Sequence, residues 1–421
     1  MTDKNLNKNL NKNIKLFQAY GIELEYMLVD LINLNIVPLA DLILGETGEK
    51  DQGAIAWSNE LALHVIEIKT NGPTPDLVKA VQDFQENIKN INQQLKPHQA
   101  CLLPTAAHPW FDPKKAKLWP HECNDIYRAY DRIFNCQGHG WVNLQSTHLN
   151  LPFSNDQEFK LLHTAIRLIL PVLPALSASS PFLNGQPSGV KDIRLDFYNH
   201  NQKNIPEISG LVIPELVFSQ SEYQEKILNK SYQAIQPYDP ENLLQHEWLN
   251  SRGAIARFSR MAIEIRILDI QECPQMDLSI VCLIIETLKK LVAGEWADFN
   301  QQADFSELEL AEIYQEAVVN GSEGILKNQK YLKLFGLKNN QKIAEKISMQ
   351  AFWQHCFNQL DQDKSARKDL APFKKSIQLI LNSGCLAERI LNNYSKDPSP
   401  EKIREIYQDL KICLDQGRAY V

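Results

Sequence analysis

The segment GIELEY at residues 21–26 constrains the fold more than any other part of the chain, because charged and apolar residues alternate in it. Alternate side chains of an extended strand point the same way, so Glu23 and Glu25 project from one face while the apolar residues pack behind them. Two adjacent carboxylates repel each other and resist burial unless a cation neutralises them. Most Glu-x-Glu pairs belong to a solvated strand face, so metal binding here needs support from the rest of the chain.

The composition is that of an ordinary globular protein. With 421 residues, 44% of them hydrophobic and 23% charged, the chain can bury one large core or two conventional ones. The net charge of -7 argues against a nucleic-acid partner, because such a protein needs a basic surface to displace counterions. A phosphorylated small molecule remains compatible, since a few arginines and bound metals supply positive charge locally.

The cysteine spacing and the apolar runs indicate the cellular compartment of the protein. None of the eight cysteines form a CxxC pair, which predicts reduced core residues of a cytosolic protein. Residues 1–15 are rich in Asn and Lys without an apolar stretch, so we expect a disordered tail there and not a secretory signal. The longest apolar run, residues 168–183, contains three prolines and is too short to span a bilayer. The sequence therefore predicts a cytoplasmic protein without a membrane segment.

Hydrophobic periodicity divides the chain into a mixed part and a helical part. Strands are predicted at residues 17–30, 61–69, 100–104, 141–151, 193–198 and 262–270. Helices are predicted between them at residues 75–95, with Thr74 as the N-cap candidate, 122–134 and 156–170. Beyond residue 276 only helices are predicted, at residues 278–293, 306–319, 341–358, 371–381, 386–393 and 400–414.

These patterns predict an α+β fold with a mostly antiparallel, curved sheet that presents polar residues on one face. The expected organisation is a disordered tail at residues 1–15, an α+β catalytic core at 16–275, and a helical C-terminal region at 276–421 that packs on the core. No internal repeat and no clear linker is visible in the sequence.

Three further predicted strands carry polar residues. Glu67 interrupts an apolar strand, where an unpaired carboxylate would cost about 3 kcal/mol or more, so it needs either a metal or a Lys or Arg partner. His148 and Asn150 share a strand face, although a lone strand histidine is more often structural than a ligand. Glu264 and Arg266 also share a face, where a simple ion pair is the alternative to ligand binding.

Together these strands would gather carboxylates on one concave side of the sheet, where we expect divalent cations to neutralise them. The carboxylates concerned are Glu23, Glu25, Glu60, Glu67 and Glu264. Oxygen ligands favour Mg²⁺ or Mn²⁺ over zinc, and Mg²⁺ normally accompanies nucleotide phosphates. The sequence therefore predicts a metal-lined funnel for phosphoryl chemistry.

Phosphate binding must come from side chains. The sequence contains no GxxxxGK[ST] loop, no protein-kinase glycine loop and no GxGxxG fingerprint. Arginines are then the expected phosphate ligands. The candidates are Arg194, Arg252, Arg257 and Arg266.

Five short motifs stand in the same order as in one known family. They are GIELE at residues 21–25, Glu60 and Glu67 followed by Thr70, THLN at 147–150, LSASSPFLNG at 176–185 with Arg194 downstream, and IEIRILD at 263–269. On these motifs, residues 20–274 resemble the glutamate–cysteine ligase family, a branch of the glutamine synthetase-like carboxylate–amine ligases. Two features depart from it: Asn150 stands where one subgroup usually has a second His, and residues 248–257 match either ligase subgroup only loosely.

The resemblance implies a glutamine synthetase/guanidino kinase-like catalytic fold and a role for each matched residue. The implied metal ligands are Glu23, Glu25, Glu60, Glu67, His148 and Glu264. The implied ATP-binding residues are His148, Asn150, Arg252, Arg257 and Arg266. The implied catalytic residues are Arg266, Arg257 and Glu67, and the implied substrate-binding residues are Arg194, Ser179 and Thr70. The implied substrates are ATP, glutamate and an amine such as cysteine, with Mg²⁺ or Mn²⁺ as the cofactor. The oligomeric state stays open.

The favoured hypothesis is an ATP-dependent glutamate–cysteine ligase that forms γ-glutamylcysteine through a γ-glutamyl phosphate. The nearest alternative is a ligase of the same fold that joins glutamate to a different amine. A guanidino kinase would have no reason to carry the THLN and SASSPF segments together. A catalytically inactive relative that binds nucleotide or glutamate would be expected to lose its carboxylates, yet all five stand in place.

Overall fold

The computed structural model describes residues 14–337 and 346–421. Its central feature is an antiparallel sheet of eight strands in the order β2-β3-β4-β1-β6-β10-β9, with β5 paired to β1 beyond the end of β4. The strands are β1 (Gly21–Asp30), β2 (Glu49–Gln52), β3 (Ile55–Asn59), β4 (Val65–Thr70), β5 (Ala100–Leu103), β6 (Ser146–Pro152), β9 (Ala254–Arg257) and β10 (Ala262–Asp269). The expected α+β fold with an antiparallel sheet is confirmed.

Alternation along the strands gives the sheet one apolar and one polar face. On β1, Ile22 and Leu24 are fully buried in the main hydrophobic cluster, as is Leu149 of β6. Three long helices contribute to the same cluster, namely α2 (Leu77–Leu95), α5 (Asp156–Ile169) and α10 (Pro274–Val292). The polar residues of these strands therefore face away from this core, toward the site described below.

A β-bulge in β10 changes which of its residues reach the polar face. The register pairs Glu264 with Asn150 but Asp269 with Ser146, so β10 carries one more residue than β6 between these pairs. Simple alternation would put Glu264 and Asp269 on opposite faces, and the extra residue brings both to the same face. The bulge thus adds a second carboxylate of β10 to the polar side.

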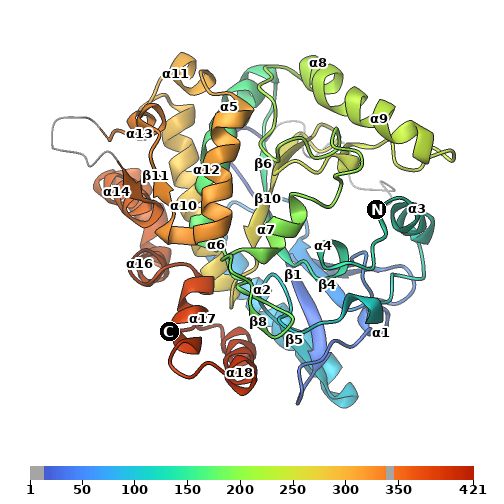
Figure 1. The fold of residues 1–421 in the computed structure, drawn as a ribbon. Helices are drawn as coiled ribbons and strands as arrows, with labels where there is room; N and C mark the ends of the chain where they lie inside the picture. The colour runs from blue at the N-terminus through green and yellow to red at the C-terminus, as the bar shows by residue number, and fades with distance from the viewer. Residues whose placement is uncertain (1–13, 338–345) are drawn as a thin grey trace.

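Helices surround the sheet on both sides (Figure 1). Those of the N-terminal part are α1 (Ala40–Leu44), α2, α3 (Asn124–Phe134), α4 (His139–Val142), α5, α6 (Pro174–Ser177), α7 (Ile193–Tyr198), α8 (Gln220–Tyr223) and α9 (Asn229–Ile235). A π-helical turn, Gln224–Leu228, joins α8 to α9. In Figure 1, α3, α8 and α9 lie on the opposite side of the sheet from the orange and red C-terminal helices.

The C-terminal part is almost entirely helical, as expected. Its helices are α10, α11 (Phe299–Ala303), α12 (Glu307–Asn320), α13 (Gln329–Leu334), α14 (Met349–Gln362), α15 (Lys364–Leu370), α16 (Lys374–Ser383), α17 (Leu386–Tyr394) and α18 (Pro400–Gln416). Residues of α10, α12 and α14 belong to the same hydrophobic cluster as the sheet. The domain boundary at residue 275 stays a prediction, since one core extends across it.

Several predicted elements differ from the structure. The segment Ile193–Tyr198 is the helix α7 and not a strand, because the Asp192 side chain accepts a hydrogen bond from the Leu195 amide and caps it. Helix α2 is capped by Asp76 and not by Thr74, whose backbone instead pairs with Tyr20 and prolongs the sheet.

Other differences concern strand boundaries. The strand predicted at 141–151 begins only at Ser146, because residues 139–142 form the short helix α4. Strands β2, β3 and β9 were missed. The two-residue strands β7 (Phe182–Leu183), β8 (Gln186–Pro187), β11 (Ile325–Leu326) and β12 (Ile347–Ser348) were also missed, and the last two interrupt the helical C-terminal part. The predicted tail, apart from residues 14 and 15, and the first residues of the helix predicted at 341–358 lie outside the described residues.

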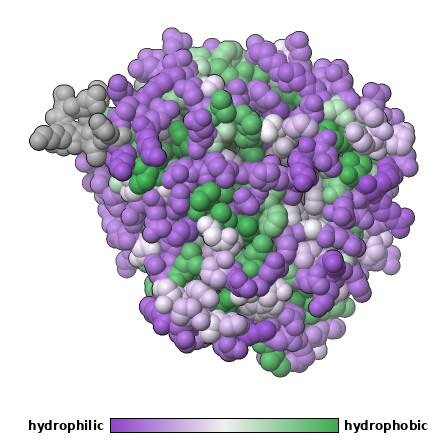
Figure 2. Space-filling view, in the orientation of Figure 1, coloured by the Kyte–Doolittle hydropathy of each residue, from purple (hydrophilic) through white to green (hydrophobic). Residues whose placement is uncertain are grey.

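All eight cysteines lie in the described parts of the chain, and none forms a disulfide. Within those parts no helix is both long and apolar enough to cross a membrane. The face of the molecule in Figure 2 is mostly hydrophilic, with apolar residues in small separate groups.

Candidate active site

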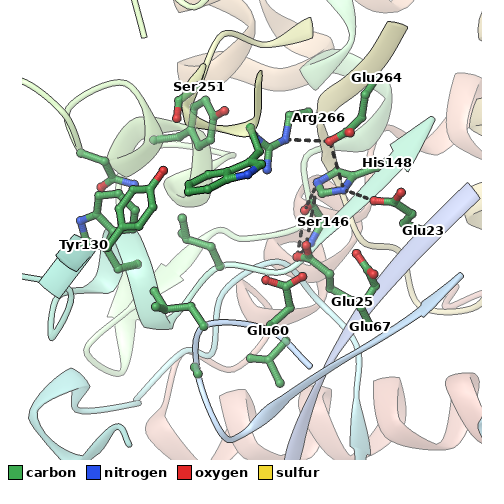
Figure 3. Close-up of a pocket in the computed structure, with 18 of the residues that line it drawn as sticks. Glu23, Glu25, Glu60, Glu67, Tyr130, Ser146, His148, Ser251, Glu264 and Arg266 are labelled. Carbon is green, nitrogen blue, oxygen red and sulfur yellow. Dashed lines mark hydrogen bonds and ion pairs between the residues drawn. The ribbon is translucent and has the colours of Figure 1, made fainter. Parts of the chain in front are cut away.

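The polar face of the sheet lines a single cavity that contains the carboxylates expected from the sequence (Figure 3). Strand register creates this grouping, since Glu25 lies opposite Glu67 across β1 and β4, and Glu23 lies opposite His148 across β1 and β6. Glu264 follows on β10, and Glu60 lies just after β3. All five carboxylates line the cavity.

His148 lies at the centre of the cluster. Its Nδ1 lies 2.8 Å from Glu23 Oε2, and its Nε2 lies 2.8 Å from the Ser146 hydroxyl. Burial disfavours the charged imidazole, but the hydrogen bond to Glu23 and the nearby Glu25 and Glu264 outweigh burial and raise the pKa of His148 to about 9. His148 is therefore a cation at neutral pH in the absence of a metal, and it bridges carboxylates from two strands.

Glu25 and Glu60 are the least neutralised members of the cluster. Glu25 Oε2 accepts hydrogen bonds from the Ser146 amide at 2.7 Å and from its hydroxyl at 2.8 Å. The Glu60 side chain has no hydrogen-bond or ion-pair partner among the described residues. Burial raises the pKa of both carboxyls, and neighbouring carboxylates raise it further. These two groups would gain most from a bound cation.

Glu67 has a partner on its own strand. Lys69 Nζ lies 2.8 Å from Glu67 Oε1, and the Ser58 hydroxyl donates to the same oxygen at 2.6 Å. Burial raises the carboxyl pKa, but the Lys69 charge and these hydrogen bonds outweigh burial, so the pKa of Glu67 is lowered to about 2. The alternative considered from the sequence, an ion pair with a Lys or Arg, is what the structure contains.

Glu264 is held by two arginines. Arg266 Nε lies 3.0 Å from Glu264 Oε1, and Arg257 Nη1 lies 3.2 Å from its Oε2. Burial raises the pKa of this carboxyl, but the two guanidinium groups outweigh burial and lower it. Arg257 is 6% exposed, and its Nε, which has no hydrogen-bond partner in the described structure, lies 3.9 Å from Glu247 Oε2.

Arg194 reaches the cavity from α7 and is fixed by the bulged end of β10. Its Nε lies 2.6 Å from Asp269 Oδ1, and its Nη2 donates to the Arg266 carbonyl at 3.2 Å. The Ser179 amide and the Ser180 hydroxyl donate to the other oxygen of Asp269. The SASSPF segment therefore acts on the cavity indirectly, through the carboxylate that positions Arg194.

Several predicted site residues do not line the cavity. Arg252 forms a bidentate ion pair with Glu215, with two N–O distances of 2.6 Å, so its guanidinium is already occupied. The Thr70 hydroxyl accepts from the Ile22 amide, and Ser179 is fully buried beside Asp269. Asn150 donates to Glu23 Oε1 from beside the cavity. As ligands of ATP or substrate, these four residues remain predictions that the geometry does not favour.

Other residues line the cavity that the sequence analysis did not single out. Lys69 and Arg260 add positive charge, and Ser146 holds Glu25. A half-buried aromatic group also lines it, consisting of Tyr127 and Tyr130 of α3, Trp141 of α4, and Trp248 of the 3-10 turn Glu247–Leu249. Lys69 could have been found from its i+2 spacing to Glu67, whereas the aromatic residues come from separate segments without a common pattern.

The cluster is chemically suited to a divalent cation. In the described residues, Glu23, His148 and Glu264 form one group, and Glu25, Glu67 and His148 form another, with the ligand atoms of each group within 4.8 Å of one another. Carboxylate oxygens with one imidazole suit Mg²⁺ or Mn²⁺. Lys69 and His148 add positive charge to the cluster, and the expected divalent cation stays a prediction.

Two solved structures share this fold. The structure superposes on a glutamate–cysteine ligase from Francisella tularensis, solved in complex with AMP, with a TM-score of 0.65 at 13% identity over 97% of this chain and 90% of that one. It also matches a bifunctional glutathione synthetase from Pasteurella multocida, with a TM-score of 0.59 at 14% identity over 94% of this chain and 53% of that one. At such identities the likeness establishes the fold alone.

The sequence comparisons establish the family. The model of glutamate–cysteine ligase family 2 matches residues 19–409, and the chain belongs to this family. An uncharacterised protein from Archaeoglobus fulgidus is 34% identical over 95% of this chain and all of its own length. A putative glutamate–cysteine ligase 2 from Bradyrhizobium sp. (strain BTAi1) is 25% identical over 62% of this chain and 58% of its own length. The chain is thus a member of a carboxylate–amine ligase family.

Proposed function

We propose that the protein uses ATP to activate the γ-carboxylate of glutamate and then joins it to an amine. The observation that carries the proposal is the placement of five carboxylates, His148 and several arginines around one cavity. This arrangement can hold an anionic nucleotide, a metal and an anionic substrate together. Cysteine is the acceptor that the family resemblance suggests, and other amines are the alternative.

A carboxylate needs activation because its oxygen is a poor leaving group. A γ-carboxylate oxygen attacks the γ-phosphorus of ATP, the P–O bond to ADP breaks, and an acyl phosphate forms. The amine nitrogen then bonds to the acyl carbon, the C–O bond to phosphate breaks, phosphate is released, and the amine proton leaves to water. Water must be kept from the acyl phosphate, which an enclosed cavity favours.

The charged residues of the cavity have distinct roles in this scheme. Arg257 and Arg266 would stabilise the oxygens of the transferring phosphoryl group, while Glu264 keeps the two guanidinium groups together. Arg194, held by Asp269, would bind the α-carboxylate of glutamate. A bound Mg²⁺ or Mn²⁺ would neutralise phosphate charge. The residues that would hold it are Glu23, Glu25, Glu67, His148 and Glu264, with Glu60 beside them.

The test is ADP formation by the purified protein with ATP, Mg²⁺ and glutamate, with and without cysteine or other amines, and with the product identified by mass spectrometry. Glu25→Ala and Glu67→Ala should each lose nearly all turnover, whereas Glu86→Ala, on the exposed surface of α2, should keep it. A γ-glutamyl amide together with ADP would support the proposal. Turnover that survives both cluster substitutions would refute the site, and absence of ATP turnover would favour an inactive nucleotide- or glutamate-binding protein.

A further inference from the structure

One wall of the cavity is lined by aromatic side chains. We call Tyr127, Tyr130, Trp141 and Trp248 the aromatic wall. Tyr130 packs at the centre, with its ring centroid 5.6 Å from that of Trp141 and 6.0 Å from that of Trp248. Figure 3 shows Tyr130 across the cavity from Glu25 and Glu67. Aromatic faces half exposed to a cavity favour an apolar or planar group.

Hydrophobic clusters support each member of the aromatic wall: Tyr127 packs against the main core, Trp141 against a small cluster that includes Phe111, and Tyr130 and Trp248 against a third cluster. Ala129 of α3 packs there with buried residues of the 205–249 region, and Tyr130 and Trp248 lie against this cluster. The rings are therefore fixed on a packed surface, and the wall is a preformed feature of the fold. Ile126 and Leu144 extend its apolar surface within the cavity.

Basic side chains of the cavity come from other elements, and most are already opposed by carboxylates. Lys69 pairs with Glu67, and Arg194 pairs with Asp269. Arg257 and Arg266 both pair with Glu264. Among the described basic residues lining the cavity, only Arg260 has no ion pair. Glutamate and the phosphates of ATP would use the paired basic residues. A carboxylate on the acceptor amine would thus find few free cations in the cavity.

Glu60 offers a carboxyl group to an amine, and a bound ammonium group would favour the ionised form of this carboxyl. Its side chain has no hydrogen-bond or ion-pair partner in the described structure, and it lies near Tyr127, whose pKa is raised by burial and further by the Glu60 charge. In Figure 3, Glu60 lies between Tyr130 and the carboxylates of β1 and β4. An ammonium group facing Glu60 would leave the body of the same molecule against the aromatic wall, where cation–π attraction adds to apolar contact.

We propose that the acceptor is a primary amine with an uncharged apolar or aromatic body and no carboxylate beside the amine, bound with its body on the aromatic wall and its ammonium toward Glu60. This inference rests on the proposed function, because it names the class of amine that the ligase uses. It departs from cysteine in predicting that the carboxylate of an amino acid weakens binding.

Two matched pairs of amines test the class. In each pair, 2-phenylethylamine against phenylalanine and cysteamine against cysteine, the members differ only by the carboxylate. With saturating ATP and glutamate, kcat/KM for ADP formation should be about tenfold higher for each decarboxylated member, and highest for 2-phenylethylamine. An amino acid that equals or exceeds its decarboxylated counterpart would overturn the proposal.

Variants of the wall test where the amine binds. Tyr130→Leu should raise KM for 2-phenylethylamine about tenfold and leave KM for ATP and glutamate unchanged. Tyr127→Leu should act in the same direction, so a folding defect of one variant does not decide the question. Tyr238→Ala is the matched control, because Tyr238 is 51% exposed and does not line the cavity. A rise in KM for ATP alone would place the adenine base on the wall and overturn the proposal.

Binding can be measured without turnover, because two tryptophans belong to the wall. In the absence of ATP and glutamate, 2-phenylethylamine should quench tryptophan fluorescence saturably, and phenylalanine should not; Tyr130→Leu should weaken the quenching. Absence of glutamate-dependent ADP formation with every amine would refute the proposed function, and the titration would still decide the binding site. Equal quenching by both compounds, or quenching by neither, would overturn the inference.

Discussion

Lys69 and Glu67 lie two residues apart on β4 and form an ion pair of 2.8 Å inside the carboxylate cluster. Glu67 is 1% exposed, so its charge depends on the neighbouring ammonium group, whereas Lys69 is partly exposed to the cavity. Glu67 also belongs to a group of residues that could hold a metal. Lys69 and a metal ion would therefore compete for the same carboxylate.

Replacing Lys69 with Met should tighten metal binding. Without the ammonium group, the Glu67 carboxylate becomes available as a ligand, and the affinity for Mn²⁺ should rise about tenfold in a titration followed by electron paramagnetic resonance. The metal-free variant should lose about 2 kcal/mol of stability, less than a fully buried pair would because Lys69 is partly exposed. Lys79→Met is the control, since Lys79 pairs with Asp83 on the surface of α2. Weaker Mn²⁺ binding by Lys69→Met would contradict the competition.

Asp269→Asn should impair glutamate binding. The substitution removes the charge that holds Arg194 Nε at 2.6 Å, so the guanidinium is less well placed for a carboxylate. We expect KM for glutamate to rise about tenfold and KM for ATP to stay constant. Arg194→Lys should likewise raise KM for glutamate and leave KM for ATP unchanged. A loss of kcat with an unchanged KM for glutamate would assign Arg194 a different role.

Arg252→Met should destabilise the fold without changing the affinity for ATP. Arg252 is 2% exposed, and its guanidinium binds Glu215 together with the carbonyls of Glu207 and Ile208. Its loss leaves a carboxylate and buried carbonyls without a donor, at a cost of about 3 kcal/mol measured by urea unfolding. Arg257→Met, in contrast to Arg252→Met, should lose a large part of the turnover. A raised KM for ATP in a stable Arg252→Met protein would restore the ATP-binding role expected from the sequence.

Stability should fall at acid pH because of buried neutral histidines. His163 has no hydrogen-bond partner in the described structure, and burial lowers its pKa to about 3, with a smaller contribution from Arg167. Between pH 6.5 and 3 the unfolded chain binds a proton that the folded chain excludes, so stability decreases as the pH falls through this window.

At pH 5 the exclusion of a proton from His163 lowers the free energy of unfolding by about 2 kcal/mol. His163→Leu should remove that part of the acid sensitivity, which thermal unfolding at pH 7 and pH 5 would detect. His98→Leu is the control, because His98 lies exposed on the surface. Equal acid sensitivity of the His163→Leu variant and the unmodified protein would show that His163 is protonated in the folded state.

The carboxylate face could be predicted from the sequence because strand periodicity is local. The two-residue alternation placed Glu23 and Glu25 together and paired Glu264 with Arg266, and the structure contains both arrangements. His148 joined them because each of these strands buries its other face in one core. The pattern of strands and helices predicted one mostly antiparallel sheet for these strands, and the resemblance to the ligase family implied the same fold.

The rest of the site depends on contacts that no short segment encodes. Residues 193–198 alternate like a strand, and only the Asp192 cap turns them into the helix that presents Arg194. The partner of Arg252 lies 37 residues away, so its structural role was not visible. The aromatic wall combines α3 with Trp141 and Trp248, which are distant in sequence and meet only in the folded chain.

The central claim is that glutamate is activated as an acyl phosphate by ATP. The most direct measurement uses glutamate labelled with ¹⁸O in its γ-carboxylate, together with ATP, Mg²⁺ and an accepted amine, and analyses the released phosphate by mass spectrometry. The mechanism predicts one ¹⁸O atom transferred to each phosphate, because the C–O bond breaks when the amine attacks. Unlabelled phosphate, or label that appears in AMP, would contradict it.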